Sequence, residues 1–279
     1  MSRSQPLISV VIPSYNDEPI IRPFYDAIVQ TLGSQLDYGF ELIYVDDGSV
    51  DPSPHTLSQL AKEDQRVTFI ELCRNYGQQR ALFAGLSVAK GDYVVTIDGD
   101  YQYPPEVILQ LVQAMGHQYE MASGIRTHRR DNWCDILASK LGNLIIRKIL
   151  AVNLQDFGSV KAFSRPLVDR ILALRHYFSD VYPIALSLHP TFVEVKVLHK
   201  QRPSGRSHWN LWMRLKLYLY FYIGYSDDHF QIPFFSRLPD YSGRDNFGNF
   251  THNFQSNIRL FSKSARNHSP SLFDFYCGF

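Results

Sequence analysis

Short runs of β-branched and apolar residues alternate with segments of helical spacing through the N-terminal part of the chain. This alternation constrains the fold more than any other feature, because it is typical of βαβ units in which helices connect parallel strands. We expect strands at Ile8–Ile12, Glu41–Val45, Val67–Leu72 and Tyr93–Ile97, and helices at Ile20–Leu32, Thr56–Lys62, Gly77–Ala89 and Pro105–Met115. The sequence therefore predicts an α/β fold with a mostly parallel, Rossmann-like sheet flanked by helices.

The pattern changes after this region. A basic loop starting at Arg126 leads into an amphipathic helix, and strands at Val160–Arg165 and Phe192–Val197, with one or two helices between them, complete the sheet. In Trp209–Tyr222, aromatic and basic residues interleave, which suits either a helix packed on the domain or a helix lying in the bilayer interface. Residues 224–279 sustain no period, and we expect them to form a poorly ordered tail.

Charge and cysteine content limit the partners and the compartment. The 28 basic and 27 acidic residues give a formal charge of +1, so no global field favours nucleic acid. The 3 cysteines form no C-x-x-C pair, which favours a reducing compartment. The N-terminus lacks the apolar stretch of a signal peptide, and no window reaches about 18 apolar residues. We expect a cytoplasmic protein whose contact with a membrane is peripheral.

Two aspartates follow the strand expected at Tyr93–Ile97. In Asp98-Gly99-Asp100 the carboxylates at positions i and i+2 would project to the same side, and the glycine would let a ligand approach the backbone. Oxygen ligands of this kind hold hard divalent cations that are shared with substrate phosphates, and Gln102 adds another oxygen. The alternative is an acidic turn, because Asp-Gly is also turn chemistry.

A second acidic pair, Asp46-Asp47, closes another expected strand. Its carboxylates could accept hydrogen bonds from a base or a ribose. Alternatively, an aspartate caps the following helix, a role that Asp51 or Ser53 could fill equally well. The first strand ends in Pro-Ser-Tyr-Asn-Asp-Glu rather than G-x-G-x-x-G, which excludes a dinucleotide-binding fold.

Several motifs occur in an order that resembles the family 2 glycosyltransferases. They are IPSYNDE, VDDGSVD, RNYGQQRALFAGLSVAKGDYVVTIDGDYQYPPE, a GIR loop, QDFGSVKAFSR and KQRPSGRSHW. Within that family the chain is similar to the branch of dolichol-phosphate mannose synthase and the bacterial undecaprenyl-phosphate sugar transferases, and most similar to the 4-deoxy-4-formamido-arabinose transferase type. The resemblance covers about residues 7–223.

The resemblance implies a GT-A-like catalytic domain over residues 1–206, an interfacial helix over 207–223 and an atypical tail over 224–279. It implies an inverting enzyme that moves a sugar from UDP or GDP to a polyprenyl phosphate, for cell-envelope glycan or lipid modification. A divalent cation, Mg²⁺ or Mn²⁺, is the implied cofactor. The implied location is the inner face of the plasma membrane, and a homo-oligomer stays an open alternative.

The same resemblance assigns roles to individual residues. Pro13, Tyr15, Glu18 and Asp47 match the positions that hold the nucleotide, with support from Asp46, and Ser207 is added to that set. Asp98, Asp100 and Gln102 match the metal and diphosphate site. Arg126 and Arg202 match the basic residues that meet phosphate. Asp156 is placed near the sugar, although a structural loop role fits it equally well, and Arg129 and Arg130 could equally lie in a solvated loop.

Three departures from the family pattern leave other functions open. His208-Trp209 replaces the usual lysine and tyrosine, Lys161 replaces an arginine, and the tail replaces two membrane-spanning helices, as a shifted reading frame would produce. The alternatives are an inactive homologue that binds a nucleotide-sugar, and a family 2 enzyme that acts on a glycan or a protein.

Overall fold

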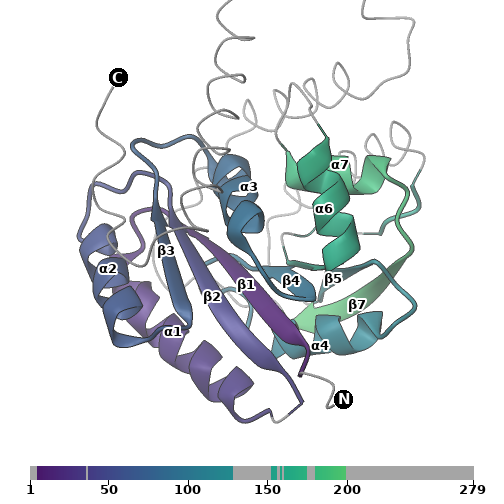
Figure 1. Ribbon diagram of the computed structural model, residues 1–279, viewed down its shortest axis with the longest axis horizontal. Helices are drawn as coiled ribbons and strands as arrows, with labels where there is room; N and C mark the ends of the chain where they lie inside the picture. Colours follow the sequence, from purple (N-terminus) through teal and green to yellow (C-terminus); the bar gives the residue numbers. More distant parts are fainter. Residues whose placement is uncertain are drawn as a thin grey trace, which may run out of the picture.

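The computed structural model describes residues 5–35, 37–127, 152–155, 158, 160–174 and 180–198, which form a seven-stranded sheet between two layers of helices (Figure 1). The strands are β1 (Leu7–Ser14), β2 (Gly39–Asp46), β3 (Val67–Glu71), β4 (Tyr93–Thr96), β5 (Met121–Thr127), β6 (Lys161–Ser164) and β7 (Phe192–Leu198). The helices are α1 (Glu18–Gly33), α2 (Ser53–Glu63), α3 (Gln78–Val88), α4 (Glu106–Met115), α6 (Arg165–Ala173) and α7 (Val181–Ser187).

The strand order determines which loops meet. The sheet runs β3-β2-β1-β4-β6-β5-β7, and β6 is antiparallel to both β4 and β5 while the other pairs are parallel. The carboxyl ends of β1, β2, β4 and β5 therefore lie at one edge of the sheet, together with the beginning of β6. Ligands of open α/β sheets bind beyond this edge.

The central strands β1, β2 and β4 are largely buried on both faces because helices cover both faces of the sheet (Figure 1). Along β1, Ile8, Val10 and Ile12 belong to the core beneath α1, α2 and α4. Val11 points the other way, into the core beneath α3, α6 and α7. Because both faces are buried, apolar residues occupy most positions of β1 and do not alternate with polar ones.

The predicted α/β fold with a mostly parallel sheet is confirmed, but one strand was missed. β5 contains Gly124, Ile125 and Arg126, which we expected in a loop. Its Met-Ala-Ser-Gly start lacks β-branched residues, and a Cβ at Gly124 would lie 2.5 Å from Val160 Cγ1. Arg165, expected to close a strand, begins α6 instead, and a proline lies in the first turn of that helix.

Several predictions lie outside the described residues. They concern the helix expected before Leu150, the interfacial segment 207–223 and the tail 224–279. None of the helices in the described ranges combines the length and the apolar character that crossing a bilayer requires.

Candidate functional site

The turn after β4 carries the D-x-D pair. β4 ends at Thr96, so Asp98 and Asp100 lie in an irregular turn. We had expected them at alternating positions at the end of the strand. A Cβ at Gly99 would lie 3.1 Å from Pro13 O, so this glycine makes room for the protein's own first loop. The chain itself occupies this side of the turn, and the expected approach of a ligand to Gly99 stays a prediction.

Both carboxylates in the turn are half-buried and have defined partners. Asp98 Oδ1 accepts a hydrogen bond from Gln78 Nε2 at 2.5 Å. Asp100 Oδ1 accepts one from the backbone N–H of Gln102 at 3.1 Å. The orientation of each carboxylate is thus restrained from a different direction, by α3 for Asp98 and by the turn itself for Asp100.

An aromatic contact anchors the same turn to α1. Tyr101 has a φ of 61°, which is uncommon for a residue with a side chain. Its ring packs edge-on against that of Phe24, with 5.1 Å between the centroids. Because this conformation is costly without support, the packing on α1 holds the backbone that joins Asp100 to Gln102.

The residues of the turn suit a divalent cation. Asp98 and Asp100 supply carboxylate oxygens, and the side chain of Gln102 is half-buried in the same turn. In the described part of the chain, no group of three or more His, Cys, Asp or Glu side chains is arranged around a metal position. Mg²⁺ typically binds through one or two carboxylates and completes its shell with substrate phosphates and water. The donor set therefore fits a cation that is shared with a phosphate ligand.

The loops after β1 and β2 are joined by hydrogen bonds. Asn16 N donates to Ser49 Oγ at 2.8 Å, and Asn16 Oδ1 accepts from Val50 N at 2.9 Å. Glu18 N donates to Asp51 Oδ2, and Asp17 N donates to Ser53 Oγ, both at 3.2 Å. These bonds join residues 16–18 to residues 49–53 in one hydrogen-bonded unit beside the D-x-D turn, which we call the ledge.

Three residues assigned to the nucleotide border this ledge. Pro13 is buried at the end of β1, whereas Tyr15 is 40% exposed and Glu18 is half-buried at the start of α1. Tyr15 is thus the residue of the three that presents a ring to solvent.

Asp46 and Asp47 are both buried, at 0% and 3% exposure. Asp46 accepts hydrogen bonds from the backbone N–H and the hydroxyl of Ser49, at 2.8 and 2.5 Å. Asp47 accepts from the backbone N–H groups of Tyr76 and Gly77, at 2.7 and 2.8 Å. Burial raises the pKa of both carboxyl groups, and these hydrogen bonds oppose that rise.

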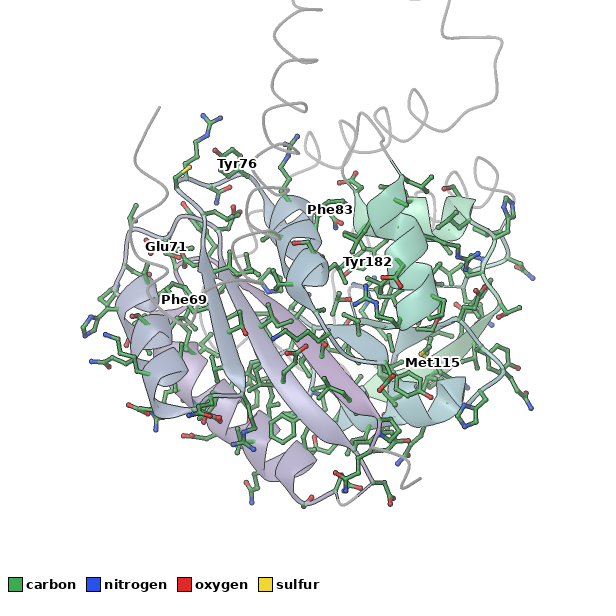
Figure 2. All side chains as sticks on the ribbon, in the orientation of Figure 1. Phe69, Glu71, Tyr76, Phe83, Met115 and Tyr182 are labelled. Carbon is green, nitrogen blue, oxygen red and sulfur yellow. The ribbon has the colours of Figure 1, made fainter. Side chains whose placement is uncertain are left out.

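The expected capping alternative is wrong for this pair. Neither Asp46 nor Asp47 bonds to the start of α2, where Ser53 N donates to Asp51 Oδ1 at 3.1 Å. Asp47 instead holds the loop that leads into α3, in which Figure 2 labels Tyr76. Asp47 therefore connects the end of β2 to the start of α3, whereas Asp46 holds the turn that contains Ser49.

The start of α3 is a part of the site that sequence reasoning missed. Gln78 reaches Asp98, and Gln79 Oε1 accepts a hydrogen bond from Val181 N at 3.2 Å. Burial raises the pKa of Asp180, and the positive charge of Arg80 partly offsets this rise. The RNYGQQR motif was the signal, but it gave no indication of which side chains turn toward the sheet edge.

The remaining assigned residues divide into two groups. Arg126 lies one residue before the end of β5 and is half-buried, at the same sheet edge as the D-x-D turn. Asp156, Arg202 and Ser207, like Arg129 and Arg130, lie outside the described residues. Gly158 is described, and Lys161 Nζ donates a hydrogen bond to its carbonyl oxygen. The beginning of β6 is thereby fixed at the same edge.

A comparison with known protein families matches residues 9–165 to the model of glycosyl transferase family 2. Among curated proteins, the undecaprenyl-phosphate 4-deoxy-4-formamido-L-arabinose transferase of Aeromonas hydrophila is 36% identical over 207 residues. The alignment covers 74% of this chain and 63% of that relative, so the chain spans less than two thirds of the relative's length.

Solved structures show the same fold. Glucosyl-3-phosphoglycerate synthase from Mycobacterium tuberculosis, with Mn²⁺, UDP and glucosyl-3-phosphoglycerate, superposes with a TM-score of 0.57 at 21% identity, covering 78% of this chain and 79% of that chain. A mannosyltransferase from Pyrobaculum calidifontis, with GDP-Man and Mn²⁺, gives 0.56 at 17% identity, covering 96% and 77%. The architecture of the described residues is the GT-A fold.

Proposed function

The chain belongs to glycosyl transferase family 2, and on that premise we propose that it is a metal-dependent inverting glycosyltransferase. The proposed reaction moves a sugar from a UDP or GDP donor to a polyprenyl phosphate. The observation that carries the proposal is the meeting of the D-x-D turn, the ledge and Arg126 at one edge of the sheet. The Aeromonas hydrophila relative, named as an undecaprenyl-phosphate transferase, supports a lipid phosphate as acceptor.

Departure of the nucleoside diphosphate is the demanding step. A divalent cation held by Asp98, Asp100 and Gln102 would supply Lewis-acid stabilisation of the charge that develops on the diphosphate. Arg126, and Arg202 outside the described residues, would bind phosphate oxygens, for which a planar guanidinium is suited. The two solved structures with the same fold contain Mn²⁺ together with UDP or GDP-Man, which supports this class of donor.

The ledge would bind the nucleotide. Tyr15 would contact the base, and the exposure of its ring supports this role. Glu18 and Asp47 would meet the base or the ribose, with Asp46 behind them and Ser207 as a further contact. Since both oxygens of Asp47 already accept backbone hydrogen bonds, any bond to a nucleotide would use their remaining lone pairs.

The acceptor explains why no general base stands out. A polyprenyl phosphate oxygen is already anionic at neutral pH, so the protein has to position it rather than deprotonate it. Asp156 would lie near the sugar, and attack from the face opposite the nucleotide would invert the anomeric centre. Because such an acceptor resides in a membrane, we place the enzyme peripherally at the inner face of the plasma membrane, with Trp209–Tyr222 as the contacting segment.

Release of nucleoside diphosphate tests this function. The full chain is incubated with Mn²⁺ and a panel of UDP- and GDP-sugars, in the presence of undecaprenyl phosphate, of a glycan or protein acceptor, or of no acceptor. Release that requires the lipid phosphate supports the proposal. Release that requires a glycan or a protein instead would assign another acceptor class, and binding of a donor without any release would identify an inactive homologue.

A further inference from the structure

The side chain of Gln78 donates a hydrogen bond to the D-x-D pair. Gln78 is the first residue of α3, and its Nε2 atom donates to Asp98 Oδ1 at 2.5 Å across 20 residues of sequence. Both side chains are half-buried at the carboxyl edge of the sheet. The amide of Gln78 thus contacts a carboxylate of the D-x-D pair directly.

The backbone that carries Gln78 is fixed on two sides. On one side, Asp47 accepts from the backbone N–H groups of Tyr76 and Gly77, and Gly77 turns the chain with a φ of 93°. On the other side, the Gln79 side chain accepts from Val181 N at the start of α7. Hydrogen bonds on both sides therefore hold the backbone from which the Gln78 amide reaches Asp98.

A fixed donor of this kind matters to a cation site. Carboxylates that bind metals are themselves hydrogen-bonded, and these outer partners orient the ligand and tune its affinity. A donor on Oδ1 restricts rotation of the Asp98 carboxylate, so less ordering is needed when a cation binds. A merely structural glutamine would instead contribute to the stability of the fold alone.

We propose that Gln78 is a positioning residue for the divalent cation at Asp98 and Asp100. This inference rests on the proposed function, because it presupposes a cation at the D-x-D pair. Residues 76–78 contact both Asp47, assigned to the nucleotide, and Asp98, assigned to the cation. The same segment at the start of α3 would then position both parts of the donor site.

The test is the affinity of the full chain for Mn²⁺, measured from the electron paramagnetic resonance of the free ion. Titrations are run with Mn²⁺ alone and with UDP or GDP added. Gln78→Met keeps the length and the helix propensity of the side chain but removes the N–H donor. We expect its Mn²⁺ affinity to fall roughly 10- to 100-fold, with a circular dichroism spectrum like that of the wild type.

Gln59→Met is the matched control, because it makes the same substitution at an exposed position on α2 and removes one side-chain hydrogen bond, to His55, away from Asp98. We expect its Mn²⁺ affinity to match the wild type. Equal affinity of Gln78→Met and Gln59→Met would overturn the inference. Asp98→Ala distinguishes failure of the cation site from failure of the role of Gln78. If Asp98→Ala binds Mn²⁺ as the wild type does, the proposed cation site is wrong. If Asp98→Ala loses Mn²⁺ affinity but Gln78→Met does not, only the role of Gln78 is rejected.

Discussion

Lys161 Nζ lies 4.7 Å from the centroid of the Tyr182 ring, in a part of the core where Lys161 has 0% exposure. The same ammonium donates to Gly158 O and, at 3.2 Å, to Ser123 Oγ on β5. Tyr182, labelled in Figure 2, extends from α7 and donates to Thr96 Oγ1 at 3.3 Å. Lys161 thus joins β6 to β5 and α7, and Tyr182 extends this connection to the end of β4.

Loss of the Lys161 ammonium should destabilise the fold. Lys161→Met keeps a long apolar side chain but leaves Gly158 O and Ser123 Oγ without their donor, and a buried group that loses its partner costs about 1–3 kcal/mol. We expect a decrease of that size in the free energy of unfolding, measured with urea. Lys196→Met, at an exposed position on β7, should stay within about 0.5 kcal/mol of the wild type. Equal effects of the two substitutions would contradict the role given to Lys161.

Gly48 determines how closely two loops of the site approach each other. It has a φ of 70°, and a Cβ there would lie 2.3 Å from the carbonyl carbon of Arg74. Gly48→Ala therefore combines backbone strain with a clash against backbone, and we expect a loss of more than about 1 kcal/mol in thermal unfolding experiments. Gly33→Ala, where no atom lies within 4 Å of the added Cβ, should be neutral or slightly stabilising. A harmless Gly48→Ala would show that the two loops are not held together in this way.

The pair of Asp64 and Arg66 predicts one pH dependence. The hydrogen bonds from Arg66 lower the pKa of Asp64 to about 2, and Tyr25 Oη adds a further bond at 2.8 Å. Since the folded pKa is depressed, the stabilisation is present above the unfolded pKa of 3.8 and is lost as the pH falls toward about 2.

Asp64→Asn should therefore be less stable than the wild type by about 1 kcal/mol at pH 7, a modest value because the Arg66 side chain is 44% exposed. The difference should shrink steadily between about pH 5 and pH 2 in urea titrations. A difference that is constant over this range would mean that the ion pair does not set the pKa of Asp64.

The sequence was most informative where strands are buried on both faces. β1 and β2 are mostly apolar, apart from Ser9 and Glu41, and their ends could be placed approximately because Ser14 and Asp46 follow the apolar residues. β5 could not be predicted, because Ser123 and Gly124 are poor strand formers and occupy a strand only through their neighbours on β6 and β7.

The same distinction applies to the site. Asp98 and Asp100 could be found because an acidic turn after an apolar strand is visible in the sequence. The bond from Gln78 to Asp98 could not, because it depends on how α3 packs over β1 and β2. Lys161 was recognised as a departure from the family, but its burial depends on Tyr182 and Ser123, which are distant in sequence.

The most direct test of the account is transfer of a labelled sugar to undecaprenyl phosphate by the full chain with Mn²⁺, comparing the wild type with Asp98→Asn. The control is Asp26→Asn, which changes an exposed aspartate on α1. We predict lipid-linked sugar from the wild type and from Asp26→Asn, and a loss of at least about 100-fold from Asp98→Asn, as for other electrostatic catalytic groups. Undiminished transfer by Asp98→Asn would contradict the central claim that the D-x-D turn holds the catalytic cation.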